Sequence, residues 1–451
     1  MARKLLVLWT LVALLCLPVS GSYAQAVPRA APTSHVMVQS LAPMPHPVAK
    51  PFDPEKATDA YLARVSGAAR ARSDAYFEGG YILLLVDALY AIAVSALLLW
   101  LGISAAIRNF AQSITRSRFL QVPIYVALFV PLVTALTFPL TLYEQFIREH
   151  AYGLSNQTLL QWFGEFAIAF GLTFAGALIV FAVFYGLIRT APRRWWVGAT
   201  VLTSVLLAAL LLITPVFISP LFNHYKPLRE GSVKTEILAL ARANGIPTDN
   251  VYEFDASRQS KRISANVSGL LGTTRISLND NLLNRCTPAE IEAVLGHEMG
   301  HYVLDHAAIL ITWFGLVFLV GFFVLDRGFN TLAGLFASSW DVRSIDDPAG
   351  LPVLYALMST FLLLAAPVTN TITRTIEAQA DIFGLNAARQ PDGFATVALK
   401  LSEYRKLDPS PLEEFLFYDH PSGRTRIFTA MRWKSAHLND PDIKAEPVSP
   451  Q

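Results

Sequence analysis

Six long runs of apolar residues alternate with polar stretches along the chain. Each run is near or above the ~20 residues that an α-helix needs to cross a bilayer, and the fifth run is the shortest. This pattern predicts a mainly α-helical, polytopic membrane protein built as a helical bundle or barrel. The runs lie at about 82–105, 120–142, 166–188, 197–219, 308–325 and 351–372.

The first 24 residues differ from all of these runs. They combine a basic start, the short apolar run Leu5–Leu17 and a small-residue exit at Ser22–Ala24. These are the parts of a secretory signal peptide. The apolar run is short for a membrane-spanning helix, and an uncleaved anchor is the alternative interpretation.

Residues 25–80 change character again. Seven prolines fall between Pro28 and Pro54, a density that regular secondary structure does not tolerate. We therefore expect a proline-rich linker here. Its second half, Ala57–Tyr76, has the composition of a helix.

Two polar segments separate and follow the apolar runs. The first shows a helix pattern over Val233–Asn244 and short strand patterns at Val251–Phe254 and Thr274–Leu278. We expect the two segments to form one domain, split by membrane helices and holding a small β element. The expected division is four membrane helices in 81–219, the first part of this domain in 220–307, two membrane helices in 308–372 and its second part in 373–451.

Composition narrows the class of protein. Hydrophobic residues make up 53% of the 451 residues and charged residues only 16%, whereas soluble domains carry about a quarter charged residues. This excludes a disordered or wholly soluble chain. The net charge of +2 gives no basis for nucleic-acid binding. The two cysteines, Cys16 and Cys286, do not make a disulfide framework.

A helix start is encoded just before residue 290. Thr287 and Glu290 have the spacing of a capping box, in which each residue bonds the backbone nitrogen of the other. Pro288 occupies the first helical position, where its fixed φ favours the helix and its missing N–H costs nothing. A helix is therefore predicted to begin at Pro288.

This helix carries the motif H-E-x-x-H. His297 and His301 lie four residues apart, so that both imidazoles can reach one Zn²⁺ from the same helix face. Glu298 lies beside them. Zinc acidifies a bound water, and a neighbouring carboxylate can take the proton and pass it to a leaving amine. The motif therefore predicts a metallopeptidase site.

A catalytic zinc site needs a third protein ligand and one open position. His306 follows His301 by five residues, one too few for the longer H-E-x-x-H-x-x-G-x-x-H form, so we interpret it as a polar residue at the helix–membrane junction. Glu377, just after the last apolar run, is the better candidate. Asp381 lies one turn further along the same helix face, where it can accept a proton-bearing nitrogen from a ligand histidine.

The two motif segments adjoin apolar runs. If the helix of the first motif continues into the run that begins near 308, His301 lies only ~10 Å from the hydrocarbon boundary. Glu377 follows a membrane segment equally closely. The zinc is therefore expected at the membrane surface, within reach of peptides that emerge from the lipid bilayer.

The sequence resembles the integral-membrane zinc metallopeptidases typified by the type I CAAX prenyl protease. More distantly, it is similar to the heat-shock-induced membrane metalloproteases of bacteria. The resemblance covers roughly Tyr81 to Ile427. It is carried by Phe138–Thr158, Pro215–Leu228, Ser264–Gly269, Ile276–Leu283, His297–His301, Glu377–Asp381 and His420-Pro421 with Arg426.

The resemblance implies a gluzincin-type site with one zinc ion. His297, His301 and Glu377 match the family's zinc ligands, Glu298 matches its general base and Asp381 its supporting carboxylate. Two further matches concern the substrate. His420 and Arg426 match a pair that steadies the oxyanion of the tetrahedral intermediate, and Asn266 matches a position that lines the substrate strand.

Orientation in the membrane is a point of tension with the family. The resemblance implies seven spanning helices and a cytosolic site, but here the first family helix is absent or replaced by the signal-like segment. The positive-inside rule places arginine-rich loops in the cytoplasm. Both parts of the split domain, and the predicted site with them, then lie on the periplasmic side of a bacterial inner membrane. The arginines are Arg108, Arg116 and Arg118 in one loop and Arg189, Arg193 and Arg194 in another, against only Arg148 in the loop between them.

Three functions are compatible with the sequence. The first is a membrane-embedded zinc metalloendopeptidase that hydrolyses membrane-proximal peptides or proteins. The second is CAAX-type processing of prenylated C-termini. The third, not an enzyme, is a transporter or scaffold with a structural zinc site. A structural site would need a fourth ligand, and Cys286, before the helix cap, is poorly placed to supply it.

Overall fold

The structure is a computed structural model that describes residues 52–269 and 274–444. The predicted signal segment and the proline-rich part of the linker up to residue 51 lie outside the described residues. Most of the described chain is helical, with one small sheet, which confirms the predicted fold class. Among the described residues, six helices are long and apolar enough to cross a membrane, as the six apolar runs predict.

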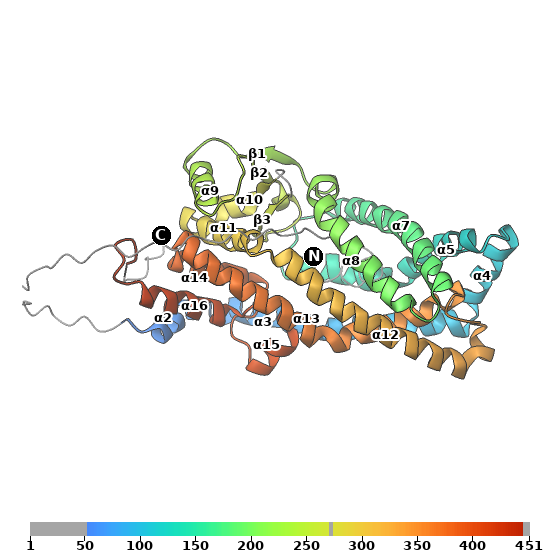
Figure 1. Ribbon diagram of the computed structural model, residues 1–451. Helices are drawn as coiled ribbons and strands as arrows, with labels where there is room; N and C mark the ends of the chain where they lie inside the picture. Colours follow the sequence, from blue (N-terminus) through green and yellow to red (C-terminus); the bar gives the residue numbers. More distant parts are fainter. Residues whose placement is uncertain (1–51, 270–273, 445–451) are drawn as a thin grey trace, which may run out of the picture.

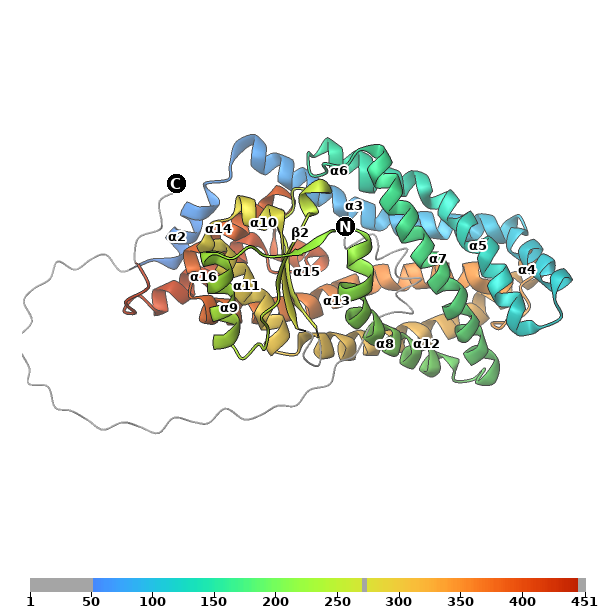
Figure 2. The same cartoon turned by 90° about the horizontal axis from the view of Figure 1, so that it is seen from above.

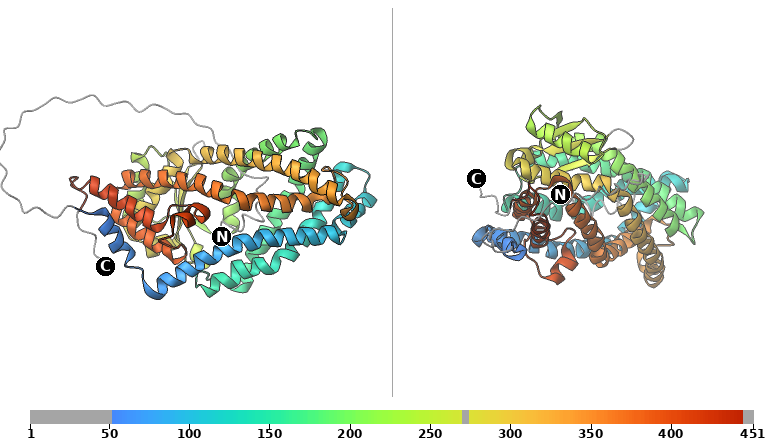
Figure 3. Two further views of the ribbon diagram at one scale, coloured as in Figure 1. Left: turned by 90° about the horizontal axis from the view of Figure 1, so that it is seen from below. Right: turned by 60° about the vertical axis from the view of Figure 1, so that its left-hand side comes forward.

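The six long helices contain the predicted runs. They are α3 (Gly67–Trp100), α5 (Arg118–Leu142), α7 (Leu159–Thr190), α8 (Trp195–Ile213), α12 (His306–Trp340) and α13 (Leu351–Ala388). A turn of π-helix (Tyr143–Ile147) and α6 (Arg148–Ala151) extend α5. The short α4 (Ile103–Ile114) joins α3 to α5. Helix α12 packs along α8 and α13, and α3 packs along α13 (Figure 3).

The first membrane helix begins earlier than predicted. Residues 67–80, assigned to the linker from the sequence, are the first turns of α3. They are polar, so hydropathy alone does not join them to the apolar run. Tertiary contacts hold them in place: the Ser73 hydroxyl donates to the carbonyl of Arg405 at 3.1 Å, and the Tyr76 hydroxyl donates to Glu149 at 2.5 Å.

The two ends of the molecule differ in content. The sheet, α9 (Ser232–Ala243), α11 (Pro288–Val303), α14 (Pro391–Lys400) and α16 (Gly423–Ala436) gather at one end, and α4 lies at the other (Figures 1 and 2). At the α4 end, buried Arg108 pairs with Asp347 at 2.8 Å. Arg118 pairs with Asp346 in the same loop. The arginine-rich loops are thus at the end opposite the two polar segments.

The small sheet has four strands in the order β1-β2-β4-β3. The pairs β1–β2 and β3–β4 are antiparallel, whereas β2 and β4 are parallel, and β3 is an edge strand. The predicted strand at Val251–Phe254 matches β2, and the second predicted strand is shifted by one residue. The strands are β1 (Tyr225–Pro227), β2 (Val251–Phe254), β3 (Ala265–Ser268) and β4 (Arg275–Asn279).

Helix α11 begins as its sequence predicts. Thr287 and Glu290 form the capping box, with the Glu290 carboxylate accepting from the Thr287 backbone nitrogen at 2.7 Å. Its apolar face, Ile291, Leu295 and Met299, packs on the sheet and α9. The short α10 (Asp280–Arg285) leads into it.

The expected continuity of α11 into the next membrane helix is wrong. Helix α11 ends at Val303, and Asp305 adopts a left-handed conformation with φ of 51° before α12 starts at His306. Aspartate tolerates this conformation better than most residues, because its short polar side chain can bond locally. The break redirects the chain and turns His306 back toward α11.

Helices α11 and α13 cross at very close range. A Cβ added at Gly384 would lie 2.7 Å from the backbone nitrogen of His297, and one added at Gly296 would lie 3.0 Å from the carbonyl oxygen of Gly384. Only residues without a side chain allow this approach. The crossing brings the second polar segment against the first.

The second polar segment packs in a separate core around α16. Helix α2 (Pro54–Leu62), expected to be part of the linker, belongs to this core through buried Tyr61 and Leu62. The Tyr61 hydroxyl donates to Asp392 on α14 at 2.7 Å. The segment also contains the short α15 (Pro411–Phe417).

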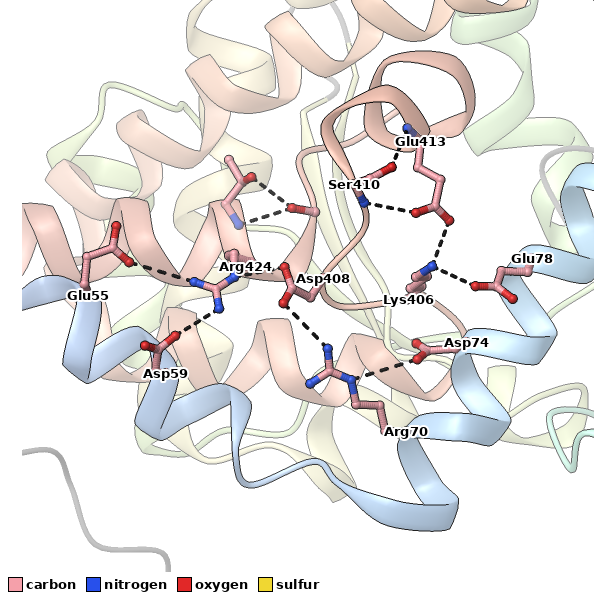
Figure 4. Close-up of polar contacts among 12 residues, drawn as sticks. Glu55, Asp59, Arg70, Asp74, Glu78, Lys406, Asp408, Ser410, Glu413 and Arg424 are labelled. Carbon is pink, nitrogen blue, oxygen red and sulfur yellow. Dashed lines mark hydrogen bonds and ion pairs between the residues drawn. The ribbon is translucent and has the colours of Figure 1, made fainter.

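A network of ion pairs ties α2 and the start of α3 to the second polar segment (Figure 4). Most of its members are at least partly exposed, so each pair contributes little by itself, but together they restrain one loop from several sides. The loop runs from residue 404 to 410. The pairs are Arg424 with Glu55, Asp59 and Asp408, Arg70 with Asp74 and Asp408, and Lys406 with Glu78 and Glu413.

The close helix crossing requires a residue without a side chain at position 384, and this requirement can be tested. In a Gly384→Ala variant the new methyl group meets backbone, which cannot yield as a flexible side chain does. We expect α13 to be displaced from α11 and the free energy of unfolding to fall by about 1–3 kcal/mol. The midpoint of thermal unfolding in detergent and the metal content should both fall.

Gly334→Ala is the matched control, because Gly334 lies in α12 with no heavy atom near the added methyl group. It should be neutral or slightly stabilising, since alanine favours helix over glycine. Equal behaviour of the two variants would contradict the role of the close crossing.

Candidate metal centre

Three side chains from two helices converge at the crossing. His297 and His301 extend from α11 and Glu377 from α13, and their ligand atoms lie within 4.8 Å of one another. The two Nε2 atoms are 3.1 Å apart. Glu377 oxygens lie 3.2 Å from Nε2 of His297 and 3.5 Å from Nε2 of His301. The structure thus brings together the three ligands expected from the sequence.

This group fits a divalent metal ion. Bonds of ~2.1 Å to a tetrahedral ion separate neighbouring ligand atoms by ~3.4 Å, close to the observed spacing. Oε2 of Glu377 is buried and accepts no hydrogen bond from the described residues, a costly state that a cation relieves. Among the described residues the group holds three ligands, and Cys286 is not one of them. Two nitrogens and one carboxylate are the ligand set of a catalytic zinc site.

A buried ion pair supports His297 from behind. Nδ1 of His297 lies 2.8 Å from Oδ1 of Asp381, which is the contact expected for a carboxylate one turn after Glu377. Nε of Arg426 donates to Oδ2 of Asp381 at 2.9 Å. With Nδ1–H held by the carboxylate, Nε2 is left free for a metal.

His301 has a support of its own, which the sequence interpretation missed. Nδ1 of His306 lies 3.0 Å from Nδ1 of His301, and Nε2 of His306 lies 3.2 Å from Oε1 of Gln379. If Nε2 of His306 donates to Gln379, its Nδ1 must accept from His301. This fixes the tautomer of His301 that presents Nε2 to a metal. His306 is only 1% exposed, and the break at Asp305 makes this position available.

Glu298 directly follows His297 in α11 and lines the cavity beside the site. Loss of water around the carboxyl raises its pKa to about 7, with Glu377 contributing in the same direction and His297 opposing. A carboxylate with a raised pKa is a stronger base than an exposed one and acts close to neutral pH.

His420 reaches the site from the turn between α15 and α16. Its Nε2 lies 3.4 Å from Oε2 of Glu377, and its Nδ1 lies 3.0 Å from the Asp419 carboxylate. In the described structure the side-chain hydrogen bonds of Arg426 are with Asp381 and with Nδ1 of His297, at 3.3 Å, and not with His420. His420 and Arg426 therefore both lie at the site but do not contact each other as a pair. His420 contacts Glu377 and Asp419, whereas Arg426 bonds Asp381.

Asn266 lies on the edge strand β3, opposite Ser277 of β4. Its Oδ1 is buried and has no hydrogen-bond partner among the described residues. An edge strand also offers free backbone groups to an extended peptide.

A cavity of about 240 Å³ opens beside the candidate metal centre. Four of the residues discussed above line it: His297, Glu298, His420 and Arg426. The rest is mostly apolar and comes from residues 263–265 at the start of β3, from α11, from α14 and from residues 401–405 after α14. It includes Ile263, Ala265, Ala293, Val294, Phe394 and Val397.

The support of His301 predicts a measurable effect on metal binding. His306→Ala removes the acceptor for Nδ1–H, so we expect metal affinity to fall by about 10- to 100-fold, the usual effect of losing such a partner. Competition with a graded series of chelators measures it. His437→Ala is the control, since His437 bonds a backbone carbonyl at the end of α16. Unchanged affinity in His306→Ala would contradict the assignment.

Comparison with known proteins agrees with this geometry. The model of peptidase family M48 matches residues 227–434, and the model described as CAAX prenyl protease N-terminal, five membrane helices, matches residues 56–224. Within the second range the described residues hold four long apolar helices and the shorter α4.

Individual relatives cover most of the chain. An uncharacterized metalloprotease, YhfN, of Bacillus subtilis (strain 168) is 32% identical over 337 residues, covering 74% of this chain and 79% of the relative. CAAX prenyl protease 1 of Saccharomyces cerevisiae is 28% identical over 330 residues, covering 69% and 72%. The crystal structure of S. mikatae Ste24p shares the fold, with a TM-score of 0.69, 24% identity and coverage of 84% of this chain and 95% of that chain. The chain belongs to peptidase family M48 and is a multi-pass membrane metalloprotease.

Proposed function

We propose that this protein is a zinc endopeptidase that cleaves peptides and proteins close to the membrane surface. The observation that carries the proposal is the convergence of His297, His301 and Glu377 beside a cavity that Glu298 faces. We propose that residues 220–307 and 373–451 supply the catalytic parts, with α2 added to the second.

Each residue at the site has a proposed role. Zinc, when bound by His297, His301 and Glu377, supplies a Lewis acid that lowers the pKa of water and polarises a carbonyl. Glu298 takes the proton from the attacking water and delivers it to the leaving amine. His420, whose Nδ1 is oriented by Asp419, donates from Nε2 to the oxyanion that develops on the carbonyl oxygen.

Arg426 has a different proposed role from the one implied by the family. Its guanidinium is engaged by Asp381 and lies against His297. We assign it to holding Asp381 in place, which in turn orients His297. Asn266 is proposed to bind the backbone of a substrate strand laid along β3, because its amide oxygen has no partner in the described structure.

The substrates are proposed to lie at the membrane. Helix α12 begins at His306, five residues after a metal ligand, and Glu377 lies in the continuation of a membrane helix. A peptide leaving the bilayer therefore meets the site before it meets bulk water.

We propose that the site faces the periplasm of a bacterial inner membrane. The arginine-rich loops lie at the α4 end, opposite the catalytic parts. If the positive-inside rule holds these loops in the cytoplasm, the site lies on the periplasmic side. Processing of prenylated CAAX termini is the second candidate. It is favoured by the name of the yeast relative, CAAX prenyl protease 1, but prenylation is a cytosolic modification and an exported site would not meet its products.

The proposed base is tested by Glu298→Gln. The amide cannot accept the proton, but the three ligands remain, so we expect full zinc content and a loss of hydrolysis of at least about 100-fold. Purified protein is assayed with an unmodified peptide and its farnesylated twin, which also separates the two substrate classes. Retained turnover in the variant would refute the assignment.

Glu292→Gln is the matched control for this experiment. Glu292 lies on the same helix, and its carboxylate accepts a hydrogen bond from Gln390 at 2.8 Å. A glutamine there should keep both zinc and activity. Equal loss in both variants would point to damage of α11 and not to loss of the base.

The orientation predicts opposite labelling of two positions. In a cysteine-free background, Asp249→Cys in the loop before β2 should react with a membrane-impermeant maleimide in cells whose outer membrane is permeabilised. Ala191→Cys, in an arginine-rich loop, should react only after the inner membrane is opened. Both positions are exposed. The reverse pattern would place the active site in the cytoplasm.

A further inference from the structure

Among the described residues, one cation that lines the active-site cavity has no ion-pair partner. Arg405 lines the cavity and is half-buried, yet its guanidinium forms no hydrogen bond or ion pair within the described parts of the chain. Three other cations in this part of the molecule are paired with carboxylates. Arg262 pairs with Glu149 at 2.9 Å, Lys406 with Glu78 at 2.7 Å and with Glu413 at 2.8 Å, and Arg426 with Asp381.

The backbone that carries Arg405 is held firmly. Its carbonyl oxygen accepts from the Ser73 hydroxyl at 3.1 Å. The next residue, Lys406, and then Asp408 belong to the ion-pair network that ties this loop to α3 and to Arg424 (Figure 4). Arg405 therefore lines the cavity from a restrained segment and not from a loose loop.

An unpaired guanidinium beside apolar walls is an unfavourable arrangement unless an anion joins it. Partial removal from water weakens its hydration, and no protein carboxylate among the described residues compensates. Arginine binds carboxylates through two parallel hydrogen bonds, which makes carboxylate the anion that its planar geometry matches.

The cavity limits what that anion can belong to. Its volume of about 240 Å³ is below the ~300–1,000 Å³ of sites for drug-sized ligands. It has room for one or two side chains of a peptide held at the metal centre. Its apolar walls, such as Val294, Phe394 and Val397, favour an apolar residue next to the carboxylate.

We propose that Arg405 is a substrate-binding residue that recognises a carboxylate of the peptide near the scissile bond. The carboxylate is either the free C-terminus of a short leaving peptide or an acidic side chain. This inference rests on the proposed endopeptidase function and adds a substrate class to it: peptides with an apolar residue followed by a negative charge.

Three peptides of one apolar core sequence test the proposal. The first ends in a free carboxylate, the second in an amide, and the third in an amide after a glutamate. The wild-type enzyme should show a kcat/KM about 10- to 100-fold higher for at least one of the two anionic peptides than for the neutral amide, as expected for a charge-assisted hydrogen bond. Preference for the first identifies the C-terminus, and preference for the third identifies a side chain.

Arg405→Gln should abolish this preference through a higher KM, leaving cleavage of the neutral amide, zinc content and thermal midpoint unchanged. Arg405→Lys should retain part of it, because the charge remains without the planar fork. Arg432→Gln, at an exposed arginine of α16, is the control and should keep the full preference. Equal loss for all three peptides in Arg405→Gln, or an unchanged preference, would overturn the proposal.

A binding measurement separates this proposal from the proposed function. Fluorescent versions of the three peptides are titrated onto zinc-loaded Glu298→Gln protein with and without Arg405→Gln. Tighter binding of an anionic peptide that disappears with Arg405→Gln supports the subsite even if the wild-type protein hydrolyses none of the three. Equal affinities for all peptides in the presence of Arg405 refute it, whatever the turnover.

Discussion

The close crossing of α11 and α13 is the constraint on which the rest of the structure depends. Two of the proposed metal ligands come from the first helix and one from the second, and the glycines at the crossing allow the backbones to approach until all three side chains could bind one ion. A methyl group at Gly384 would meet the backbone of His297 itself. The spacing of the three side chains at the candidate metal centre therefore depends directly on the packing of these two helices.

Around the crossing, each ligand histidine is held by a partner brought from another element. Asp381 holds His297 and is itself held by Arg426 of α16, while His306 at the start of α12 holds His301. These contacts join the membrane helices, α11 and the C-terminal segment. A site built this way is pre-organised before substrate arrives, which is what metal chemistry at a fixed position requires.

The residue types of the site could be read from the sequence because the motif is local. H-E-x-x-H places two imidazoles on one helix face by the helical repeat alone, and Glu377 with Asp381 repeats the same spacing argument on another helix. The role of His306 could not be read in this way. It depends on the left-handed turn at Asp305, and the regular continuation of the helix expected from hydropathy would have pointed the side chain elsewhere.

The sequence by itself determined the membrane class, the six spans, the start of α11 and the residues that can bind a metal, because hydropathy, caps and helical periodicity act over a few turns. Only the tertiary structure decided that α2 and the first turns of α3 belong with the C-terminal segment and that Arg426 bonds Asp381 and not His420. It also decided that Arg405 lines the cavity with no ion-pair partner among the described residues. These features join residues up to several hundred positions apart. Such pairings are selected by packing and by the need to neutralise buried charge, and no local pattern records them.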